Sequence, residues 1–397
     1  MIEDNKIVKH CKLCLMTNQK PFSINETKNK LNDQKKTTLS FDESGNCLAC
    51  QDKIFKKSID WVERERELKD LCDKYRSKNG NYDCIVSGSG GKDSMFQAYI
   101  LKYKYHMNPL TVTYSPIIKT SVGIKNLTNW VNVGGFDNYT FSANGKVLSI
   151  LTREAFKNLL HPAQPFKVGI KTFAVKMAKN FNINLIFYGE EYSDYGSNKM
   201  LPDAHYPIEW LINDEDINDI YLGGSQVKEI KKKYNFLRDQ DFIPYKPLTS
   251  EDIKKFDLNV LFLGYFLEWD PQEVYYYASN HSGYIPGDYK SDGSYGRYSS
   301  IDDKMEFLHY YCHYIKYGIG RCRLDASQEI RNGHITREEG ISLCKKFEGE
   351  FPKRYANDCF KFMGYTREEA MKIIDEFRPR HLWKKNNNKW IRKQEIF

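Results

Sequence analysis

A glycine-rich turn at residues 87–94, with the sequence SGSGGKDS, combines residue types that bind the phosphates of a nucleotide. It follows the apolar run Cys84-Ile85-Val86, which is typical of a buried strand, and it precedes a helical pattern of apolar residues. Glycines let the backbone approach a phosphate closely, and the start of the next helix presents unpaired N–H groups and the positive end of its dipole. Asp93 is compatible with a polyphosphate only if a cation such as Mg²⁺ lies between them. We therefore expect a nucleotide polyphosphate and Mg²⁺ to bind at this turn.

The spacing within this turn distinguishes it from two common phosphate-binding patterns. No Ser or Thr follows Lys92, as a Walker loop requires, and the glycines lack the spacing G-x-G-x-x-G. The turn resembles the S-G-G-x-D-S loop of ATP pyrophosphatases, which split ATP into AMP and pyrophosphate and adenylate an oxygen of the substrate. The alternative, a turn that only connects a strand to a helix, is disfavoured because all six motif positions match. The resemblance implies ATP binding by all eight residues, with Lys92 and Asp93 acting in catalysis: Ser87, Gly88, Ser89, Gly90, Gly91, Lys92, Asp93 and Ser94.

Four of the ten cysteines form two Cys-x-x-Cys pairs near the start of the sequence. Thiolates at this spacing are typical ligands of a tetrahedral zinc ion, with one knuckle of a ribbon for each pair. The 32 residues between the pairs form a longer loop than usual, but extra loop length costs little closure entropy. An iron–sulfur cluster and metal-free redox thiols are the alternatives. We predict a structural Zn²⁺ site, which would also order a very polar segment, at Cys11, Cys14, Cys47 and Cys50.

Composition excludes several classes of protein. The 397 residues include 60 Lys and Arg against 52 Asp and Glu, a formal net charge of +8. This modest excess suits an anionic partner such as a nucleotide, a sugar nucleotide or RNA, although the pI of about 8.7 is below the value of about 9 that is typical of a nucleic-acid-binding domain. The longest apolar run, residues 260–267, is far shorter than the ~20 residues of a membrane-spanning helix, and the first residues show no secretory signal. We expect a cytoplasmic protein that binds neither membranes nor nucleic acid.

The elements that must position these residues alternate between strands and helices. Strands are expected at residues 84–86, 110–114, 139–141, 185–188 and 260–263, and helices at residues 58–78, 146–160 and 168–181, the first beginning at Ser58. Such alternation implies right-handed βαβ crossovers and a mostly parallel, Rossmann-like α/β sheet. We expect three units: a four-cysteine zinc ribbon at 1–57, an α/β domain at 58–300 and a helical C-terminal region at 301–397.

Residues typical of a glutaminase nucleophile are missing from the sequence. Position 2 is Ile2, where one glutaminase class has a cysteine, and no cysteine has the flanking glycines of a nucleophile elbow. If the reaction consumes ammonia, we therefore expect a separate subunit to supply it.

Longer motifs extend the resemblance to the N-acetyl sugar amidotransferases of pseudaminic-acid and lipopolysaccharide biosynthesis (PseA and WbpG type). Besides the glycine-rich turn, these motifs lie at residues 41–50 (FDESGNCLAC), 108–116 (NPLTVTYSP), 135–147 (GFDNYTFSANGKV), 161–170 (HPAQPFKVGI), 186–191 (IFYGEE) and 301–339. The resemblance covers nearly the whole chain and implies a PP-loop ATPase fold of the HUP class. After Gly189-Glu190, however, residues 191–199 (EYSDYGSNK) depart from the acidic and glycine-rich pattern of the family.

The family resemblance also implies an activity. The acetamido group of a sugar, nucleotide-linked or free, is converted into an acetamidino group through an O-adenylyl imidate that ammonia attacks. Such sugars belong to bacterial O antigens and glycosylated flagellins. The implied partners are a glutaminase subunit and a cyclase-like subunit that channels the ammonia.

Several other residues are candidates for the site, each with a structural alternative. Glu190, which follows a predicted strand, is a third catalytic candidate, with the role of holding Mg²⁺ or a sugar hydroxyl. The structural alternative is that Glu190 only caps a turn. Asp302 and Asp303 serve the site or only stabilise the dipole of a helix. Three arginines are candidates for binding an anion and three histidines for accepting a proton; the alternative is that all six are only surface or packed residues. They are Arg321, Arg323, Arg331, His309, His313 and His334.

Two other functions fit parts of the sequence. Thiolation-type tRNA-modifying enzymes also join a cysteine ribbon to this ATP loop, but they need a catalytic cysteine near the loop and a strongly basic surface. Cys84 lies within the predicted strand, and the net charge is modest. A non-catalytic binding module is the third possibility, which the intact loop disfavours.

Overall fold

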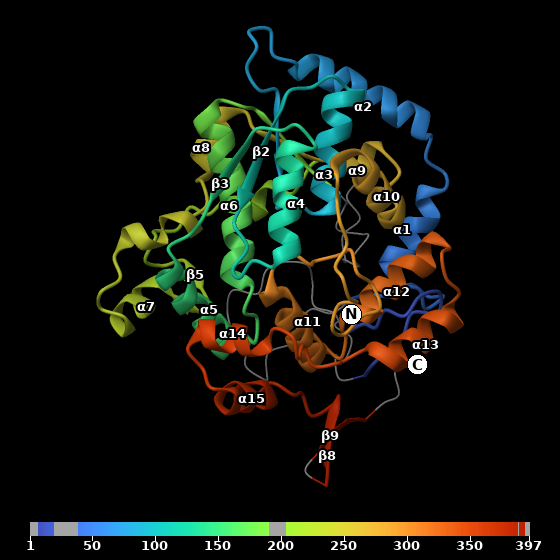
Figure 1. The fold of residues 1–397 in the computed structure, drawn as a ribbon, viewed down its shortest axis with the longest axis vertical. Helices are drawn as coiled ribbons and strands as arrows, with labels where there is room; N and C mark the ends of the chain where they lie inside the picture. Colours follow the sequence, from blue (N-terminus) through green and yellow to red (C-terminus); the bar gives the residue numbers. More distant parts are fainter. Residues whose placement is uncertain (1–6, 20–38, 190–203, 388, 394–397) are drawn as a thin grey trace.

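A five-stranded parallel sheet lies at the centre of the computed structural model, which describes residues 7–19, 39–189, 204–387 and 389–393 (Figure 1). Its strands, in the spatial order β3-β2-β1-β4-β7, are β1 (Cys84–Ser87), β2 (Pro109–Tyr114), β3 (Asn138–Phe141), β4 (Leu185–Tyr188) and β7 (Asn259–Phe262). All five predicted strands are present, with bounds within one residue of those expected. The strand order reverses between β1 and β4, and ligands of such sheets bind outside the carboxyl ends of the strands at this switch point. The prediction of a parallel α/β fold is confirmed.

Both faces of the sheet are buried, because successive side chains along each central strand point to opposite sides. Cys84 and Val86 pack into one apolar cluster, whereas Ile85 between them packs into another, and β4 and β7 alternate in the same way. Strands covered on both faces need apolar residues at every position. This explains why these strands are continuous apolar runs in the sequence.

Helices form the two layers around the sheet (Figure 1). One face is covered by α2 (Trp61–Tyr75), α3 (Lys92–Tyr99, extended by the π-helical Ile100–Lys104), α4 (Ser121–Asn132), α9 (Leu263–Phe266) and α10 (Pro271–Ser282). The other face is covered by α6 (Gln164–Phe181) and α8 (Ser250–Phe256). The helix expected to begin at Ser58 begins later, because the Asp60 side chain accepts hydrogen bonds from the N–H groups of Val62 and Glu63 and caps α2.

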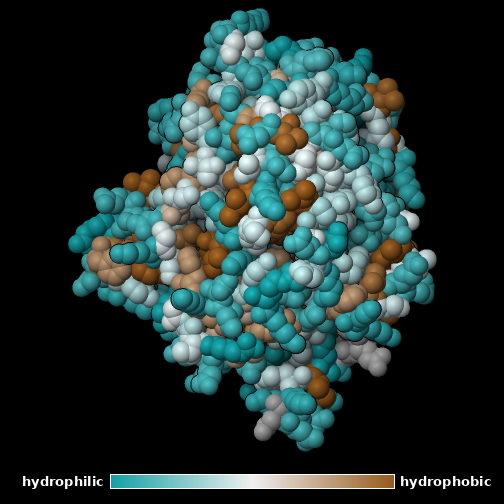
Figure 2. All heavy atoms as spheres, in the orientation of Figure 1, coloured by the Kyte–Doolittle hydropathy of each residue, from teal (hydrophilic) through white to brown (hydrophobic). Residues whose placement is uncertain are grey.

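A smaller apolar cluster lies beside the sheet. It joins α5 (Gly145–Leu159) to α7 (Val227–Lys233), the 3₁₀ helix Asp239–Tyr245 and the hairpin β5 (Tyr221–Leu222) and β6 (Ser225–Gln226). A further 3₁₀ turn, Ile208–Trp210, packs on the sheet. The face of the molecule in Figure 2 is largely hydrophilic, with its apolar residues in small separate groups. In the described part of the chain, no helix has both the length and the apolar character needed to cross a bilayer.

The C-terminal region is mainly helical, as predicted, and lies below the sheet in Figure 1. It contains α11 (Lys304–Tyr317), α12 (Arg321–Asn332), α13 (Arg337–Phe347), α14 (Ala356–Met363) and α15 (Arg367–Glu376). It ends in an antiparallel hairpin of β8 (Trp383–Asn386) and β9 (Lys389–Arg392), which the polar sequence did not predict. The hairpin is held by long-range contacts, since the Trp383 indole N–H donates to the carbonyl of Ile315.

Candidate functional site

The glycine-rich loop joins the carboxyl end of β1 to the start of α3, at the switch point of the sheet. Gly90 has a φ of +79°, and a Cβ there would lie 2.7 Å from backbone atoms of Leu127 in α4, so that only glycine fits. A Cβ on Gly91, in contrast, would meet no atom within 4 Å. Gly91 is also the N-cap of α3, whose first N–H groups have no acceptor within the helix. The loop therefore leaves an open space, lined by backbone donors, that fits an anion.

Gly90→Ala is expected to lower the free energy of unfolding by about 3 kcal/mol, because the new methyl group overlaps the backbone of α4 and the left-handed φ is strained. Urea denaturation measures this change. Gly91→Ala is the matched control: it has open space and an ordinary φ, so it should lose no more than the ~1 kcal/mol typical of an N-cap substitution. A Gly90→Ala variant as stable as this control would contradict the close approach of the loop to α4.

The charged residues of the loop lie together at the first turn of α3. Lys92 Nζ is 2.6 Å from Asp93 Oδ1, and the Lys92 side chain is 5% exposed while that of Asp93 is 31% exposed. Ser94 Oγ donates to the carbonyl of Gly91 at 3.0 Å and so supports the loop backbone. The Ser89 hydroxyl lies close enough to the carboxyl of Asp302, which precedes α11, to oppose the rise that burial causes in the pKa of that carboxyl. The loop thus contacts the C-terminal region directly.

A cavity of about 190 Å³ lies in front of the loop. Residues 90–93 and Asn126 of α4 line one side. The other lining residues come from one face of α12, from α11 and from the segment between α10 and α11: Tyr284, Tyr298, Ser299, Ser300, Ile301, Asp302, Tyr310, Arg321, Leu324, Asp325 and Gln328. The α12 residues follow a spacing of three or four, which places them on one side of the helix. This spacing was the only sequence signal for Asp325 and Gln328, which the sequence analysis missed.

Asp302 and Asp303 are adjacent but have different roles. The Asp303 carboxylate caps α11 through Met305 N–H and accepts hydrogen bonds from the N–H groups of Ile117 (2.6 Å) and Ile118 (3.0 Å), which follow β2. Burial raises the pKa of Asp303 to about 7. Burial also raises the pKa of Asp302. Asp303 therefore holds the start of α11 in place, whereas Asp302 faces the cavity.

Arg321 is the one of the three candidate arginines that lines the cavity. It donates to Asp325 and to the Ser300 hydroxyl, both at 2.8 Å, and its guanidinium lies 4.6 Å from the centre of the Tyr310 ring. Arg331 lies in the last turn of α12 and is not among the residues that line the cavity. Arg321 thus presents a positive charge to the cavity on a side chain fixed by three contacts.

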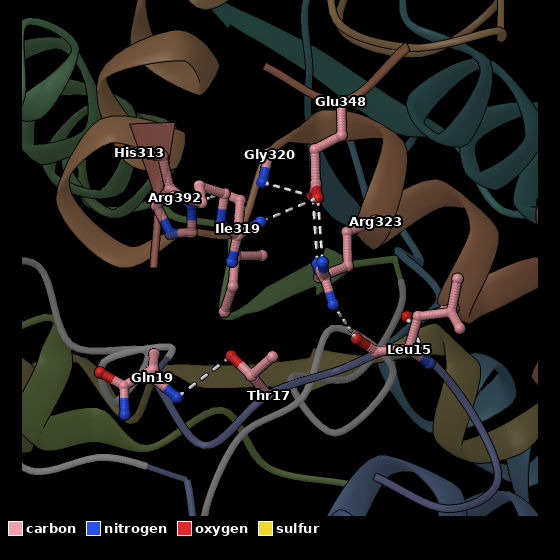
Figure 3. A network of polar contacts seen from close by, with 10 residues as sticks. Leu15, Thr17, Gln19, His313, Ile319, Gly320, Arg323, Glu348 and Arg392 are labelled. Carbon is pink, nitrogen blue, oxygen red and sulfur yellow. Dashed lines mark hydrogen bonds and ion pairs between the residues drawn. The ribbon is translucent and has the colours of Figure 1, made fainter. Parts of the chain in front are cut away.

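Arg323 does not reach the cavity, so its predicted roles of substrate contact or solvated surface residue were both wrong. It is fully buried and donates to the Glu348 carboxylate at 3.0 and 3.1 Å and to the carbonyl of Leu15 at 2.7 Å (Figure 3). Gly320 N–H, at the start of α12, donates to the same carboxylate, and Arg392 of the hairpin lies 3.6 Å from it. This buried network joins the cysteine region, α12, the end of α13 and the hairpin. The sequence reveals the charge of Arg323 but not its distant partner.

The four paired cysteines come together as predicted, in a buried cluster that packs on α12. The Sγ atoms of Cys11 and Cys50 are 3.8 Å apart, those of Cys14 and Cys47 are 3.6 Å apart, and all four lie within 4.8 Å of one another. Four sulfurs around a zinc ion at about 2.3 Å are separated by about 3.8 Å. Backbone N–H groups of Met16 and Cys47 point at two of the sulfurs, as suits thiolate ligands. The donor set and its spacing fit a metal ion. The helix α1 (Leu48–Lys56) begins within the second knuckle, since Cys47 is its N-cap and Cys50 lies in its first turn.

The remaining predicted candidates are dispersed. His334 Nε2 lies 2.7 Å from the Asp270 carboxylate, and His313 Nδ1 lies 2.6 Å from the carbonyl oxygen of Ile319. His309 is buried, and its ring stacks on that of His161 with the ring centres 4.5 Å apart. Glu190 lies outside the described residues, and the strand that precedes it, β4, ends beside β1 at the switch point.

Residues 293–396 match the family model described as "LPS biosynthesis protein WbpG-like, C-terminal domain". This match confirms the expected family resemblance and includes the α12 residues that line the cavity. The chain is also similar to the uncharacterized protein MJ1599 of Methanocaldococcus jannaschii, with 24% identity over 233 residues, 59% of this chain and 76% of that protein.

Two solved structures are similar to parts of the chain. The NMN synthetase from Francisella tularensis has 14% identity and a TM-score of 0.27, covering 57% of this chain and 95% of that one. The NH3-dependent NAD synthetase from Campylobacter jejuni has 13% identity and a TM-score of 0.28, covering 58% of this chain and 100% of that one.

Proposed function

We propose that this chain, which carries a WbpG-like C-terminal domain, is an ATP-dependent, AMP-forming ligase that converts the acetamido group of a bacterial surface sugar into an acetamidino group. One observation carries the proposal: a single cavity is lined by the ATP pyrophosphatase-like loop on one side and by α12 of the WbpG-like domain on the other. ATP bound at the loop therefore faces residues from the domain named for lipopolysaccharide biosynthesis. We place the reaction in the cytoplasm, where ATP is available.

The chemistry requires activation of the amide oxygen, because ammonia cannot displace that oxygen unaided. In the proposed reaction this oxygen attacks the α-phosphorus of ATP, the bond to pyrophosphate breaks, and an O-adenylyl imidate forms. Ammonia then adds to the imidate carbon, the bond from carbon to the AMP oxygen breaks, and the surplus proton leaves to water. Amide, ATP and ammonia thus give amidine, AMP and pyrophosphate.

The loop residues have roles that follow from their geometry. Backbone N–H groups at the start of α3 stabilise the charge that develops on the departing pyrophosphate. Lys92 and Asp93 pair with each other here, and with Mg²⁺-ATP present we expect Lys92 to bind a phosphate and Asp93 to bind the cation. Glu190 is proposed to hold Mg²⁺ or a sugar hydroxyl, on the basis of its position after β4. The four-cysteine cluster is proposed to hold structural zinc.

Ammonia is proposed to come from a separate glutaminase subunit through a cyclase-like channelling subunit. All ten cysteines belong to the described residues and all are buried, so none is exposed as a thiol nucleophile for glutamine. The same fact disfavours the tRNA-thiolation alternative, which needs a reactive cysteine near the loop. Cys84 is fully buried in β1, and burial raises its pKa well above the ordinary value.

The test is an incubation of the purified protein with ATP, Mg²⁺, isotopically labelled ammonium and candidate acetamido sugars, analysed by mass spectrometry. The expected product has NH in place of one oxygen, contains the label and forms together with one AMP per sugar. Omission of ATP is the control and should leave the sugar unchanged. AMP formation only in the presence of tRNA, without an amidine from any sugar, would contradict the proposal.

A further inference from the structure

A second, smaller cavity adjoins the cavity in front of the loop. Its volume is about 20 Å³, and its walls come from residues 271–272 at the start of α10, from the segment 291–299 and from one side of α12 as far as His334. A single water molecule needs about 10–15 Å³ of such volume, so this side cavity accepts one molecule of that size. A sugar or a nucleotide is too large for it.

The side cavity and the cavity at the loop share part of their walls. Four residues line both: Tyr298, Ser299, Asp325 and Gln328. Tyr298 also relates the side cavity to the loop, because its hydroxyl donates to Glu329 Oε1 at 3.3 Å while its ring centre lies 5.9 Å from Lys92 Nζ. A small molecule in the side cavity is therefore separated from a substrate at the loop only by the side chains of these shared residues.

The wall of the side cavity carries a carboxylate whose charge no cation balances. Glu329 is half-buried and accepts hydrogen bonds from the hydroxyls of Tyr295 (2.9 Å) and Tyr298. Burial, with a smaller contribution from the charge of Asp325, raises the pKa of Glu329, and no Lys, Arg or His is among the principal influences on it. Asp325 differs, because Arg321 Nε donates to it at 2.8 Å. A carboxylate partly removed from water is stabilised by an opposite charge, so the side cavity favours a cation.

Size and hydrogen bonding identify ammonium as the cation that suits the side cavity. Ammonium has about the size of a water molecule, whereas Mg²⁺ retains several waters and needs more space. A carboxylate has about four acceptor positions, and the two tyrosine hydroxyls occupy two of those of Glu329, so Glu329 can still accept an N–H donor. The cavity at the loop has the opposite character, because Lys92 and Arg321 line it and repel ammonium.

We propose that the side cavity binds the ammonium ion that supplies the nitrogen of the product, with Glu329 as its main partner. The use of this nitrogen in an amidine rests on the proposed function, whereas the binding of ammonium does not. His334 lines the side cavity with 29% of its side chain exposed, so ammonium enters there while ATP and the sugar occupy the cavity at the loop. The ion passes one proton to water before its nitrogen adds to the imidate carbon.

The kinetic test measures product formation with ammonium chloride as the only nitrogen source, at constant ionic strength. Glu329→Gln should raise the KM for ammonium about tenfold or more, since a charge-assisted hydrogen bond is lost. The KM for ATP should not change, and thermal unfolding checks that the variant is folded. Glu273→Gln is the matched control: it makes the same chemical change at an exposed position in the first turn of α10, outside the side cavity, and should keep the KM of the wild type.

Thallium(I), which has the charge and nearly the size of ammonium, tests binding without turnover. A crystal soaked in a thallium(I) salt should give an anomalous peak beside Glu329, and Glu329→Gln should lack that peak. A wild-type side cavity that holds only water would overturn the proposal. So would a thallium peak together with an unchanged KM for ammonium in Glu329→Gln, which would indicate a site for an activating cation such as potassium. Glu329-dependent thallium binding without an amidine from any sugar would support the ammonium site and contradict the proposed function alone.

Discussion

Asp93→Asn is expected to lower the rate of AMP formation from ATP at least about 100-fold and to leave the fold intact. The substitution keeps the size of the side chain but removes the negative charge that we assign to Mg²⁺. The remaining amide is a weak ligand for a hard cation that strongly prefers charged oxygens. Asp93 lies at the mouth of the cavity with 31% of its side chain exposed, so the loss of its ion pair with Lys92 costs little stability.

Pyrophosphate release measures the activity of the Asp93→Asn variant, and thermal unfolding measures its stability. Asp73→Asn is the matched control, because it makes the same chemical change on an exposed face of α2, where Asp73 pairs with Arg76. The control should keep both the activity and the unfolding midpoint of the wild type. Unchanged AMP formation in Asp93→Asn would show that ATP does not react at this loop.

Removal of the metal from the four-cysteine cluster is expected to disorder both cysteine knuckles and to lower AMP formation at least about tenfold. Four thiolates bind zinc with an apparent free energy of about 10–16 kcal/mol, and this binding replaces the core that so short and polar a segment lacks. Loss of the knuckles also removes the Leu15 carbonyl from the buried Arg323, whose partner Glu348 holds the start of α12. Arg321 is the first residue of that helix, so disorder should spread to the cavity.

Cys47→Ser and treatment with a strong chelator are two independent ways to test this expectation. Elemental analysis should find one zinc per chain in the wild type, and hydrogen exchange should show loss of protection at residues 7–19 and 39–56. Cys72→Ala, which alters a single buried cysteine outside the cluster, should retain the zinc and the activity. Stoichiometric iron, or a metal-free protein with ordered knuckles, would contradict the zinc assignment.

The parts of the site that a contiguous motif forms were predictable from the sequence. Residues 87–94 lie where a strand, a turn and a helix meet, and the residue types needed for that turn are also those needed for phosphate binding. Gly90 and Gly91 still differ in a way that no motif reveals. A side chain at Gly90 would overlap the backbone of α4, whereas Gly91 borders open space that a ligand can fill. The cysteine pairs were equally clear, since their spacing specifies the ligand geometry directly.

The parts of the site that distant segments form were not predictable. Arg321 and Arg323 are two residues apart, yet one faces the cavity and the other is buried on Glu348, because α12 turns by about 200° between them. Which face of a helix meets a substrate depends on what packs against the opposite face, and here that is the cysteine region. For the same reason, the sequence did not predict that Asp325 lines the cavity or that the ring of His161 stacks on that of His309.

The terminal hairpin was missed for a different physical reason. Its strands are short and carry exposed lysines, so they lack the alternation of apolar and polar residues that marks a half-buried strand. They are held to the core by contacts with distant residues, such as the hydrogen bond of Trp383 to Ile315 of α11 and the contact of Arg392 with Glu348.

The division of the cavity between two regions of the chain suggests how specificity can change during evolution. On the proposed function, the loop and the sheet bind ATP, which is the same in every host, so we expect substitutions there to be penalised whatever sugar is modified. The exposed face of α12 lies on the other wall, and its side chains can be exchanged without disturbing the nucleotide. Homologues that modify different sugars should therefore share the loop and differ on that face of α12. Residues such as Arg323 and Glu348, which hold α12 in its position, should remain the same.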